Sequence, residues 1–437
     1  MKPNTSAMQR APLQVHLASL GCAKNLVDSE RILGRLAAAG AVVNAPPEEA
    51  DVILVNTCGF IQPAKEESVE TILRLARFKR TGRCRALLVM GCLAQRYAAE
   101  LRGQIPEADG IFGLAEQDAI LAACGLRAHA GAHAGRFLLT PRHTAYLRIA
   151  DGCDNRCAYC AIPQIRGPFR SRPAAELLAE ARGLVARGAR ELNLIGQDTS
   201  LYGADLPGAP RIHQLLARLS RIPKLHWLRL LYTHPAHFSD ALVEAYARTP
   251  RLVPYVDLPL QHLNDEILQR MGRRVTQAQV LGLIERLRDR VPGVAIRTSL
   301  ITGFPGETRE QFLEMLRLVR RLRFEYLGVF AYSREEGTRA ARMRAQVSRR
   351  TAEGRRREIM AAQQEIAFAR NRALVGSRAA ALIDVPRPDG SWLARTAIQA
   401  PDVDSVTIVT GRNLHAGKLA KVRITGWKEY DLVAETE

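Results

Sequence analysis

The sequence predicts an α/β protein with three parts: an N-terminal parallel α/β domain over residues 1–137, a central domain over 138–372, and a small antiparallel β-barrel over 373–437. The central domain is expected to form an open (βα) partial barrel from about 138 to 340, followed by a helical linker. Three observations support this prediction. Short apolar runs alternate with helical stretches through the first two parts. A charged helical stretch over 341–372 then ends the alternation. Beyond it, short β-type runs are separated by turn signals such as Pro-Asp-Gly.

Within the N-terminal domain, the apolar runs LASLGC, VILVNTC and ALLVMGC each end in a cysteine. These cysteines are Cys22, Cys58 and Cys92, and a glycine adjoins each of them, at Gly21, Gly59 and Gly91. Helical stretches around 28–39 and 63–79 separate the runs, which is typical of parallel strands. Ligands bind beyond the carboxyl ends of such strands, so the three cysteines can converge on one iron-sulfur cluster. The alternative is that they are buried as small apolar side chains.

A second group of three cysteines opens the central domain. Cys153, Cys157 and Cys160 stand in ADGCDNRCAYCAIP with the spacing C-x3-C-x2-C. Three thiolates on one tight loop can hold three irons of a 4Fe-4S cube and leave the fourth iron open to a small molecule. The alternatives are merely structural cysteines or a zinc site completed by a distant histidine, although zinc ligands usually come as paired C-x2-C units. Cys84 and Cys124 share neither context, and we expect them to be structural.

Composition indicates a reducing compartment for these thiols. The chain has 437 residues, of which 47% are hydrophobic, enough for several packed cores. It contains no apolar run of about eighteen residues, and its N-terminal stretch lacks the apolar core of a signal peptide. We therefore expect a soluble cytoplasmic protein without a membrane partner. In that compartment clustered cysteines are more often metal ligands or catalytic groups than disulfides.

Polar residues end the predicted strands of the central domain. In a barrel of parallel strands the active site lies at the carboxyl ends, so these residues should rim it. They are Gln197, Asp198, Gln261, His262 and the turn over 302–306. Any one of them could equally be a helix cap or a turn residue.

Two groups of three cysteines on one chain resemble the methylthiotransferases of the radical S-adenosylmethionine superfamily, and the resemblance covers essentially the whole chain. Tyr159, just before Cys160, belongs to the same pattern. The segments SLGCAKNLVDSE, VNTCGFIQPAKEES, IADGCDNRCAYCAIPQIRG, LIGQDTSLYG, LYTHP, DLPLQH, GFPGET and YSREEGT look like the RimO-type subgroup. Its tRNA-modifying relatives carry Gln-Asn where this chain has Gln197-Asp198. One departure is Ala23, where the family usually has proline; it adjoins Cys22 in the backbone and is not itself a ligand.

The resemblance implies two 4Fe-4S clusters and S-adenosylmethionine as cofactors. The central cluster would cleave S-adenosylmethionine to a 5'-deoxyadenosyl radical, and the N-terminal cluster would carry the sulfur. The substrate would be the β-carbon of an aspartate in small-subunit ribosomal protein twelve, free or in the ribosomal subunit. An electron donor such as flavodoxin or ferredoxin would be a partner. The implied cofactor contacts are Tyr159, Gln197, Asp198, Arg297, Gly303 and Phe304. The C-terminal barrel resembles the TRAM module, an OB-like barrel often used on RNA.

Charge helps to choose among substrates. The formal charge is +19 overall, +3 over 1–137 and zero over 373–437, which leaves +16 between them. Because phosphate neutralisation supplies most non-specific affinity, a neutral C-terminal barrel favours a protein substrate over tRNA. The basic excess includes Arg339, Arg342, Arg344, Arg349, Arg350, Arg355, Arg356 and Arg357. These could meet ribosomal RNA or form a solvated helix face. Two alternatives remain: a tRNA adenosine methylthiotransferase, and an RNA-binding ribosome-assembly factor with structural clusters.

Overall fold

A computed structural model describes residues 11–127 and 135–437. Most of the N-terminal stretch in which the sequence shows no signal-peptide core lies outside the described residues. The chain divides into two compact units. Unit 1 comprises Met1–Leu139 and Gln164–Arg166, and unit 2 comprises Thr140–Pro163 and Gly167–Glu437.

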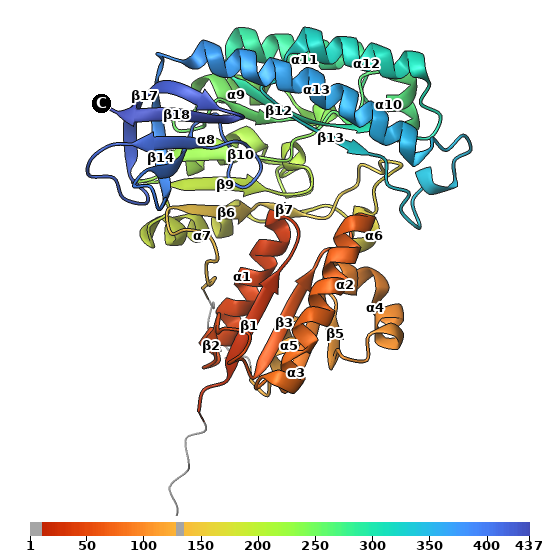
Figure 1. Cartoon of the computed structure of the whole chain (residues 1–437), viewed down its shortest axis with the longest axis vertical. Helices are drawn as coiled ribbons and strands as arrows, with labels where there is room; N and C mark the ends of the chain where they lie inside the picture. The colour runs from red at the N-terminus through yellow and green to blue at the C-terminus, as the bar shows by residue number, and fades with distance from the viewer. Residues whose placement is uncertain (1–10, 128–134) are drawn as a thin grey trace, which may run out of the picture. The chain divides into compact units, whose positions relative to one another are not determined.

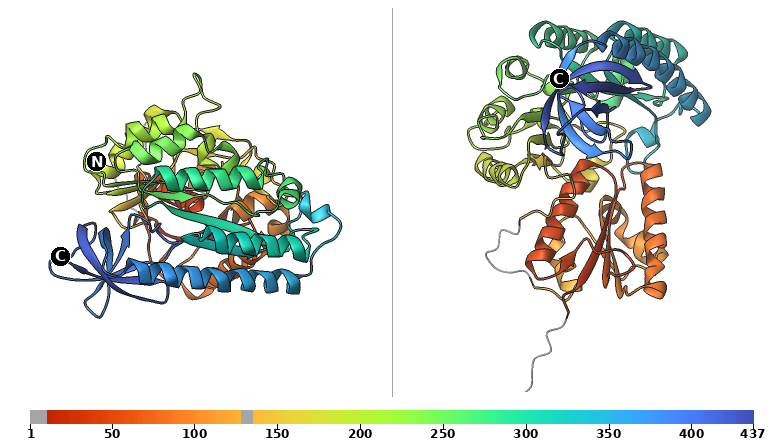
Figure 2. Two further views of the ribbon diagram at one scale, coloured as in Figure 1. Left: turned by 90° about the horizontal axis from the view of Figure 1, so that it is seen from above. Right: turned by 60° about the vertical axis from the view of Figure 1, so that its left-hand side comes forward.

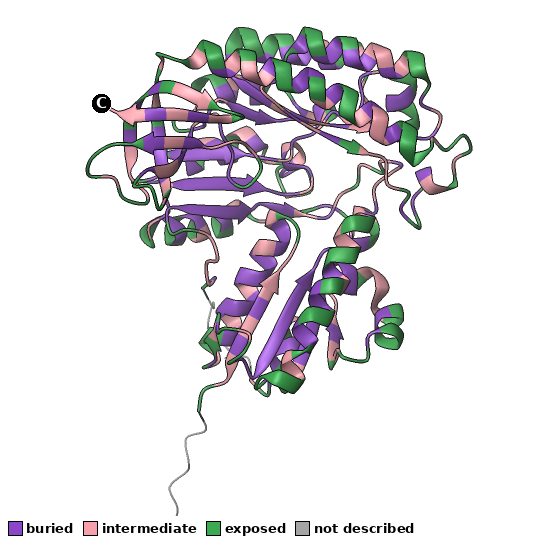
Figure 3. Cartoon of the chain, in the orientation of Figure 1, coloured by how far each residue is buried: buried purple, intermediate pink, exposed green. Residues whose placement is uncertain are grey.

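Unit 1 is built on a parallel sheet with the strand order β2-β1-β3-β4-β5 (Figure 1). Its strands are β1 (Gln14–Ser19), β2 (Val42–Val43), β3 (Val52–Thr57), β4 (Ala86–Gly91) and β5 (Gly110–Phe112). Its helices are α1 (Ala23–Ala38), α2 (Gln62–Ala76), α3 (Phe78–Thr81), α4 (Cys92–Gln104) and α5 (Gln117–Ala123). Strand β3 is buried along its whole length (Figure 3), as its continuous apolar run requires of a central parallel strand.

Alternating side chains of the sheet feed two separate cores. Ile53 packs on one face with Ile72 of α2, and Leu54 packs on the other with Ile32 of α1 and Ile120 of α5. Helices therefore cover both faces of the sheet, and the predicted parallel α/β domain is confirmed.

Unit 2 begins with an open barrel of parallel strands. Two three-stranded sheets, β6-β9-β10 and β11-β12-β13, are linked by a parallel bridge between Leu228 and Leu252. The strands are β6 (Thr144–Arg148), β9 (Glu191–Ile195), β10 (Trp227–Leu230), β11 (Tyr255–Asp257), β12 (Ala295–Thr302) and β13 (Tyr326–Ala331). The helices of this part are α6 (Ile162–Arg166), α7 (Ala174–Ala186), α8 (Ile212–Leu219), α9 (Asp240–Arg248), α10 (Asp265–Met271), α11 (Gln277–Arg290) and α12 (Arg309–Leu322). The short strands β7 (Ala150–Asp151) and β8 (Arg170–Ser171) pair antiparallel beside the cysteine loop. The predicted partial barrel is confirmed.

Helix α13 (Arg349–Leu374) packs beside α12 and leads into a closed C-terminal barrel (Figure 2). The strand order of this barrel is β14-β15-β16-β18-β17. Its strands are β14 (Arg378–Pro386), β15 (Trp392–Thr396), β16 (Thr407–Thr410), β17 (Leu419–Lys428) and β18 (Asp431–Thr436). Four of its five strand pairs are antiparallel, as predicted, but β16 and β18 run parallel. Along the sequence, β17 comes between β16 and β18 and runs in the opposite direction to β18. Strands β16 and β18 therefore point the same way where they pair to close the barrel.

Buried charges join this barrel to the central strands. Arg395 of β15 contacts Glu191 at 2.6 Å and Asp384 at 2.9 Å, and Arg229 contacts Glu191 at 3.1 Å. The hydroxyl of Tyr255 donates to Asp404 at 2.6 Å. Because Glu191 and Tyr255 each begin a strand, the C-terminal barrel packs at the amino ends of the parallel strands.

Candidate active site

In unit 1 the three N-terminal cysteines lie at the carboxyl ends of neighbouring strands. Cys22 caps α1 after β1, Cys58 follows β3, and Cys92 begins α4 after β4. Gly21 has φ +86°, and a Cβ atom there would lie 2.8 Å from the Cβ of Cys58. Glycine is therefore required for the turn before Cys22 to pack against Cys58. The three cysteines therefore lie at one edge of the sheet, and their role as cluster ligands stays a prediction.

The chemistry of this group suits an iron-sulfur cluster. All three cysteines are free thiols. Burial raises the pKa of Cys58 and raises that of Cys92 to about 12. Burial also acts to raise the pKa of Cys22, but Lys24, the backbone of Asn25 and Arg166 outweigh it and leave this pKa lowered. Thiols that stay protonated when buried release their protons to a bound metal, and three sulfur donors match the ligation of iron-sulfur clusters.

Two residues of this site were not predicted. Arg166 belongs to unit 1, and its Nη2 lies 2.8 Å from Oδ2 of Asp28 and 3.6 Å from Sγ of Cys92. The amide oxygen of Asn25 also lies 3.2 Å from this sulfur. Both residues stand in segments that resemble the family, SLGCAKNLVDSE and CAIPQIRG, but nothing local to either segment links them to a cysteine far away in the sequence.

The central cysteines lie on the loop between β7 and α6 in unit 2. The backbone N–H of Cys160 donates to the carbonyl of Cys157 at 3.1 Å, which closes a tight turn. The N–H of Cys153 donates to the carbonyl of Gly167 at 3.1 Å, and that of Ala158 donates to Met271 at 2.8 Å. These backbone bonds fix the loop at both ends and in its middle.

The central thiols, like the N-terminal ones, suit an iron-sulfur cluster. Burial raises the pKa of Cys153 to about 11 and that of Cys160 to about 12. Arg273 places Nη1 3.9 Å from Sγ of Cys157 and favours the charged form of Cys160. Arg273 was not predicted, because the run MGRR in which it stands carries no ligand pattern.

Gln197 and Asp198 follow β9 and reach the cysteine loop, as predicted for residues that rim the site. Asp198 is fully buried and accepts a hydrogen bond at 2.8 Å from Asn155, which lies between Cys153 and Cys157. Gln197 donates to Asp151 at 3.1 Å, and its own amide oxygen is buried without a partner. The buried carboxylate of Asp198 and the unpartnered amide oxygen of Gln197 therefore lie beside the loop, and both groups are suited to contact a bound cation.

Two histidines after β10 complete this part of the site. Nδ1 of His237 lies 2.7 Å from Oδ2 of Asp198. Burial acts to raise the pKa of Asp198, but the hydrogen bond from His237 and neighbouring groups outweigh it and leave this pKa lowered. Ligand atoms of His234, His237 and Asp198 lie within 4.8 Å of one another.

His234 is a neutral hydrogen-bond donor. Burial lowers its pKa to about 3, so its ring is uncharged at neutral pH. Its Nδ1 accepts the N–H of Ala236 at 3.2 Å, which places the ring proton on Nε2. This Nε2 is buried without a partner, so it suits an acceptor on a bound molecule. The segment LYTHP at a strand end contains His234, although no role was predicted from it, and His237 lies two residues beyond this segment.

Gln261 and His262 follow β11 and lie at the same end of the strands. Gln261 has φ +71°, and its N–H donates to Ser299 at 2.7 Å. His262 is fully buried, accepts the N–H of Asn264 on Nδ1, and places Nε2 3.5 Å from Oε2 of Glu307. Both residues thus shape the turn, which is the alternative role foreseen for them.

Gly303, Phe304 and Tyr159 have packing roles in the structure. Gly303 has φ +71°, and a Cβ atom there would lie 3.0 Å from Cα of Ala352. Phe304 is fully buried in a cluster that includes Ala158 of the cysteine loop, and Tyr159 packs against the same cluster. Phe304 and Tyr159 thus pack in one cluster with Ala158 of the loop, and the contact of all three residues with the cofactor remains a prediction.

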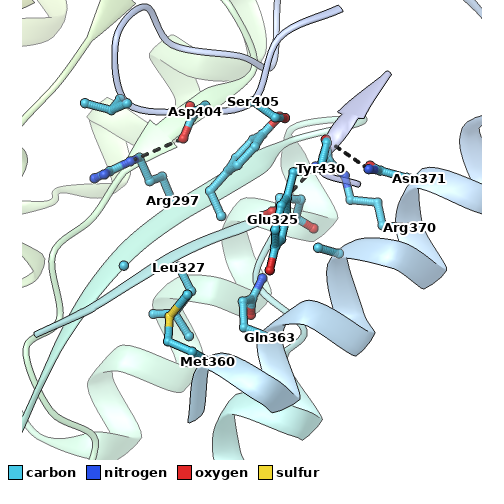
Figure 4. Close-up of a pocket in the computed structure, with 14 residues that line it drawn as sticks. Arg297, Glu325, Leu327, Met360, Gln363, Arg370, Asn371, Asp404, Ser405 and Tyr430 are labelled. Atoms are coloured by element: carbon cyan, nitrogen blue, oxygen red, sulfur yellow. Dashed lines mark hydrogen bonds and ion pairs between the residues drawn. The ribbon is translucent and has the colours of Figure 1, made fainter. Parts of the chain in front are cut away.

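Arg297 lies on the amino-terminal half of β12 (Figure 4). Its Nη1 lies 3.4 Å from Asp257, and its Nε lies 3.4 Å from Asp404 of the C-terminal barrel. It lines a cavity of about 230 Å³ together with Gln363 and Tyr430. Its side chain is engaged at the end of the strands opposite the cysteine loop, so its role as a cofactor contact remains a prediction.

Three family models match the chain in order. The model "Uncharacterized protein family UPF0004" matches residues 14–113, "Radical SAM superfamily" matches 147–319, and "TRAM domain" matches 375–436.

Solved structures share the fold. The cobalamin-bound radical S-adenosylmethionine methyltransferase TsrM from Kitasatospora setae has a TM-score of 0.53 at 16% identity, over 74% of this chain and 75% of that one. The cobalamin-dependent S-adenosylmethionine radical enzyme OxsB has a TM-score of 0.52 at 10% identity, over 76% of this chain and 54% of that one.

Curated relatives match over nearly their whole length. "Ribosomal protein uS12 methylthiotransferase RimO" of Geobacter sulfurreducens is 45% identical over 98% of this chain and 99% of the relative. The protein of the same name from Heliobacterium modesticaldum is 46% identical over 97% and 95%. Together with two groups of three cysteines, one at the carboxyl ends of parallel strands and one on the loop after β7, this similarity shows that the chain belongs to the RimO family of ribosomal protein uS12 methylthiotransferases.

Proposed function

We propose that this chain is a radical S-adenosylmethionine enzyme that methylthiolates the β-carbon of an aspartate in ribosomal protein uS12. The observation that carries the proposal is the presence of two groups of three free cysteines, of which Cys58 and Cys92 are buried, on a chain whose near-full-length relatives are named ribosomal protein uS12 methylthiotransferase RimO. When bound, two 4Fe-4S clusters and S-adenosylmethionine supply one-electron cleavage of the cofactor and transfer of sulfur, which no side chain can perform.

The residues of the chain divide this work between the two sites. Cys153, Cys157 and Cys160 would hold three irons of one cluster, and Cys22, Cys58 and Cys92 would hold three irons of the other. Asp198 offers a buried carboxylate to the ammonium group of S-adenosylmethionine, and the Nε2–H of His234 offers a donor to one of its oxygens. Backbone hydrogen bonds hold the cysteine loop in place, and the bond from Asn155 ties this loop to the carboxylate of Asp198.

Charge supports a protein substrate over tRNA. The C-terminal barrel has no net charge, and the side chains of two of its charged residues, Arg395 and Asp404, are buried against the central strands, where they contact Glu191 and Arg297. Its surface therefore lacks the basic excess that phosphate binding requires.

Contact with ribosomal RNA would fall to arginines beside α13. Arg342, Arg344 and Arg349 are exposed. Arg355 is not available for this role, because it is buried and donates to the carbonyl of Glu307 at 2.9 Å. We propose that the exposed arginines meet ribosomal RNA when the substrate is part of the small subunit.

We also propose a cytoplasmic location and a small electron-transfer protein, such as flavodoxin or ferredoxin, as the reductant. Both follow from the chemistry, which needs reduced thiols and a one-electron donor. Among residues 11–127 and 135–437, no helix is long and apolar enough to cross a membrane.

The test is anaerobic turnover of the reconstituted protein with S-adenosylmethionine and a reductant. A uS12 peptide and a tRNA are offered side by side, and both are analysed by mass spectrometry. We expect one methylthio group on the peptide aspartate. The same gain on tRNA would assign the chain to tRNA modification, and an absence of 5'-deoxyadenosine would contradict radical chemistry altogether.

A further inference from the structure

A buried arginine lies among the N-terminal cysteines. The side chain of Arg166 is 2% exposed, and its Nη2 lies 2.8 Å from Asp28, 2.8 Å from Oδ1 of Asn25 and 3.6 Å from Sγ of Cys92. All four residues belong to unit 1. A guanidinium keeps its proton at any pH that a protein survives, so this site carries a permanent positive charge.

The acceptors that hold Arg166 are themselves fixed. The amide nitrogen of Asn25 donates to the carbonyls of Leu20 at 3.1 Å and Thr57 at 2.9 Å. These two bonds turn Oδ1 of Asn25 toward both Arg166 and Cys92. When the sulfur of Cys92 gives up its proton to bind iron, Oδ1 keeps Arg166 as a donor. The hydrogen bonds from the guanidinium to Asn25 and Asp28 therefore do not depend on the proton of Cys92.

The carboxylate of Asp28 offsets the cost of burying the positive charge of Arg166. Its side chain is 7% exposed, and a buried arginine without a carboxylate would face a desolvation cost of several kcal/mol. The ion pair itself adds little net stability, because desolvation offsets most of its attraction. Its effect on the adjacent sulfur gives the pair a role that an apolar pair could not fill.

We propose that Arg166 raises the reduction potential of the cluster held by Cys22, Cys58 and Cys92, and that Asp28 positions the guanidinium for this purpose. The proposal rests on the proposed function, which supplies that cluster. Reduction adds an electron to a group that is already anionic. A positive charge and an N–H beside one of its sulfurs therefore favour the reduced form, since net charge and hydrogen bonds to sulfur set such potentials.

The experiment measures the N-terminal cluster alone. The full chain carrying Cys153→Ala, Cys157→Ala and Cys160→Ala is reconstituted anaerobically and titrated with reductant while the electron paramagnetic resonance signal is followed. The iron content per chain is measured in parallel. Arg166→Gln removes the charge and keeps an amide donor, and Arg166→Lys keeps the charge.

Arg35 offers a matched control. It also forms an ion pair with an aspartate, Asp118, in unit 1. It lies on α1 thirteen residues after Cys22, which is about 20 Å along the helix.

We expect Arg166→Gln to shift the midpoint potential to more negative values with unchanged iron content, Arg166→Lys to lie between it and the parent, and Arg35→Gln to match the parent. An unchanged midpoint in Arg166→Gln would overturn the proposal. Loss of the cluster from Arg166→Gln would overturn it too, because Arg166 would then be a structural residue. Failure of the parent to bind iron would instead count against the proposed function.

Discussion

Replacing Arg395 by methionine should destabilise unit 2 by about 3 kcal/mol. Arg395 is 6% exposed and contacts the fully buried Glu191 at 2.6 Å and Asp384 at 2.9 Å. Removing one partner of a buried ion pair typically costs about 3–5 kcal/mol. We take the lower end, because Glu191 keeps Arg229 at 3.1 Å and Asp384 keeps His143 at 2.7 Å.

The assay is thermal unfolding of the cofactor-free protein, followed by circular dichroism. A loss of about 3 kcal/mol corresponds to a decrease in Tm of roughly 6 °C for a unit of this size. Arg423 is the control, because it pairs with Glu435 in the same barrel while both side chains are about half exposed. Arg423→Gln should cost less than about 1 kcal/mol. If Arg395→Met and Arg423→Gln lowered Tm equally, burial of the network would not be the source of its stability.

The pH dependence of this effect has a definite sign. Burial acts to raise the pKa values of Glu191 and Asp384, but their hydrogen-bonded partners outweigh it and leave both pKa values lowered. Groups with a lowered folded pKa stabilise the protein above their unfolded pKa values, which lie near 4, and lose that contribution as pH falls through the folded values. The difference between parent and Arg395→Met should thus be full at pH 7 and shrink below about pH 4. A difference of equal size at pH 7 and pH 3 would contradict this account.

Three further predictions concern the active site. Cys153→Ala should abolish formation of 5'-deoxyadenosine, whereas Cys22→Ala should still form it but transfer no methylthio group; liquid chromatography with mass spectrometry measures both products. Gly303→Ala should lower Tm, because the site has φ +71° and its Cβ would crowd Ala352, whereas Gly354→Ala in open space on α13 should match or raise Tm. Asp198→Asn should weaken binding of S-adenosylmethionine about 10-fold or more, as expected from loss of a charge-assisted hydrogen bond worth about 1.5–3 kcal/mol; isothermal titration would show no change if this carboxylate does not face the cofactor.

The fold was predictable where local pattern and global topology agree. In unit 1, three apolar runs that each end in a cysteine were enough to place Cys22, Cys58 and Cys92 at one edge of a sheet, because parallel strands share the direction of their carboxyl ends. The parallel pairing of β16 and β18 was not predictable from the same kind of pattern. Short alternating runs indicate strands but do not say which of them closes a barrel.

The site was predictable only in its sulfur ligands and strand-end residues. Arg166 and Arg273 approach cysteines from distant parts of the sequence, and a single arginine in a helix or turn has no spacing that would indicate a ligand. For Arg355 the sequence favoured an exposed side chain, because it lies in a charged run, but the structure buries this side chain against Glu307. Sequence shows which charges a segment carries, whereas burial depends on contacts between segments.

The two ends of the parallel strands in unit 2 have different chemistry. Their carboxyl ends present the loop of Cys153 and the polar atoms of Gln197 and His234, some of which are buried without a partner. Their amino ends present ion pairs such as that of Arg229 with Glu191, and Arg395 of the C-terminal barrel also contacts this glutamate. Unsatisfied polar atoms cost stability unless a ligand completes them, whereas completed ion pairs resist change. Substitutions of the unpartnered polar residues at the carboxyl ends should therefore alter activity more than stability, and substitutions of the ion-paired residues at the amino ends should do the reverse.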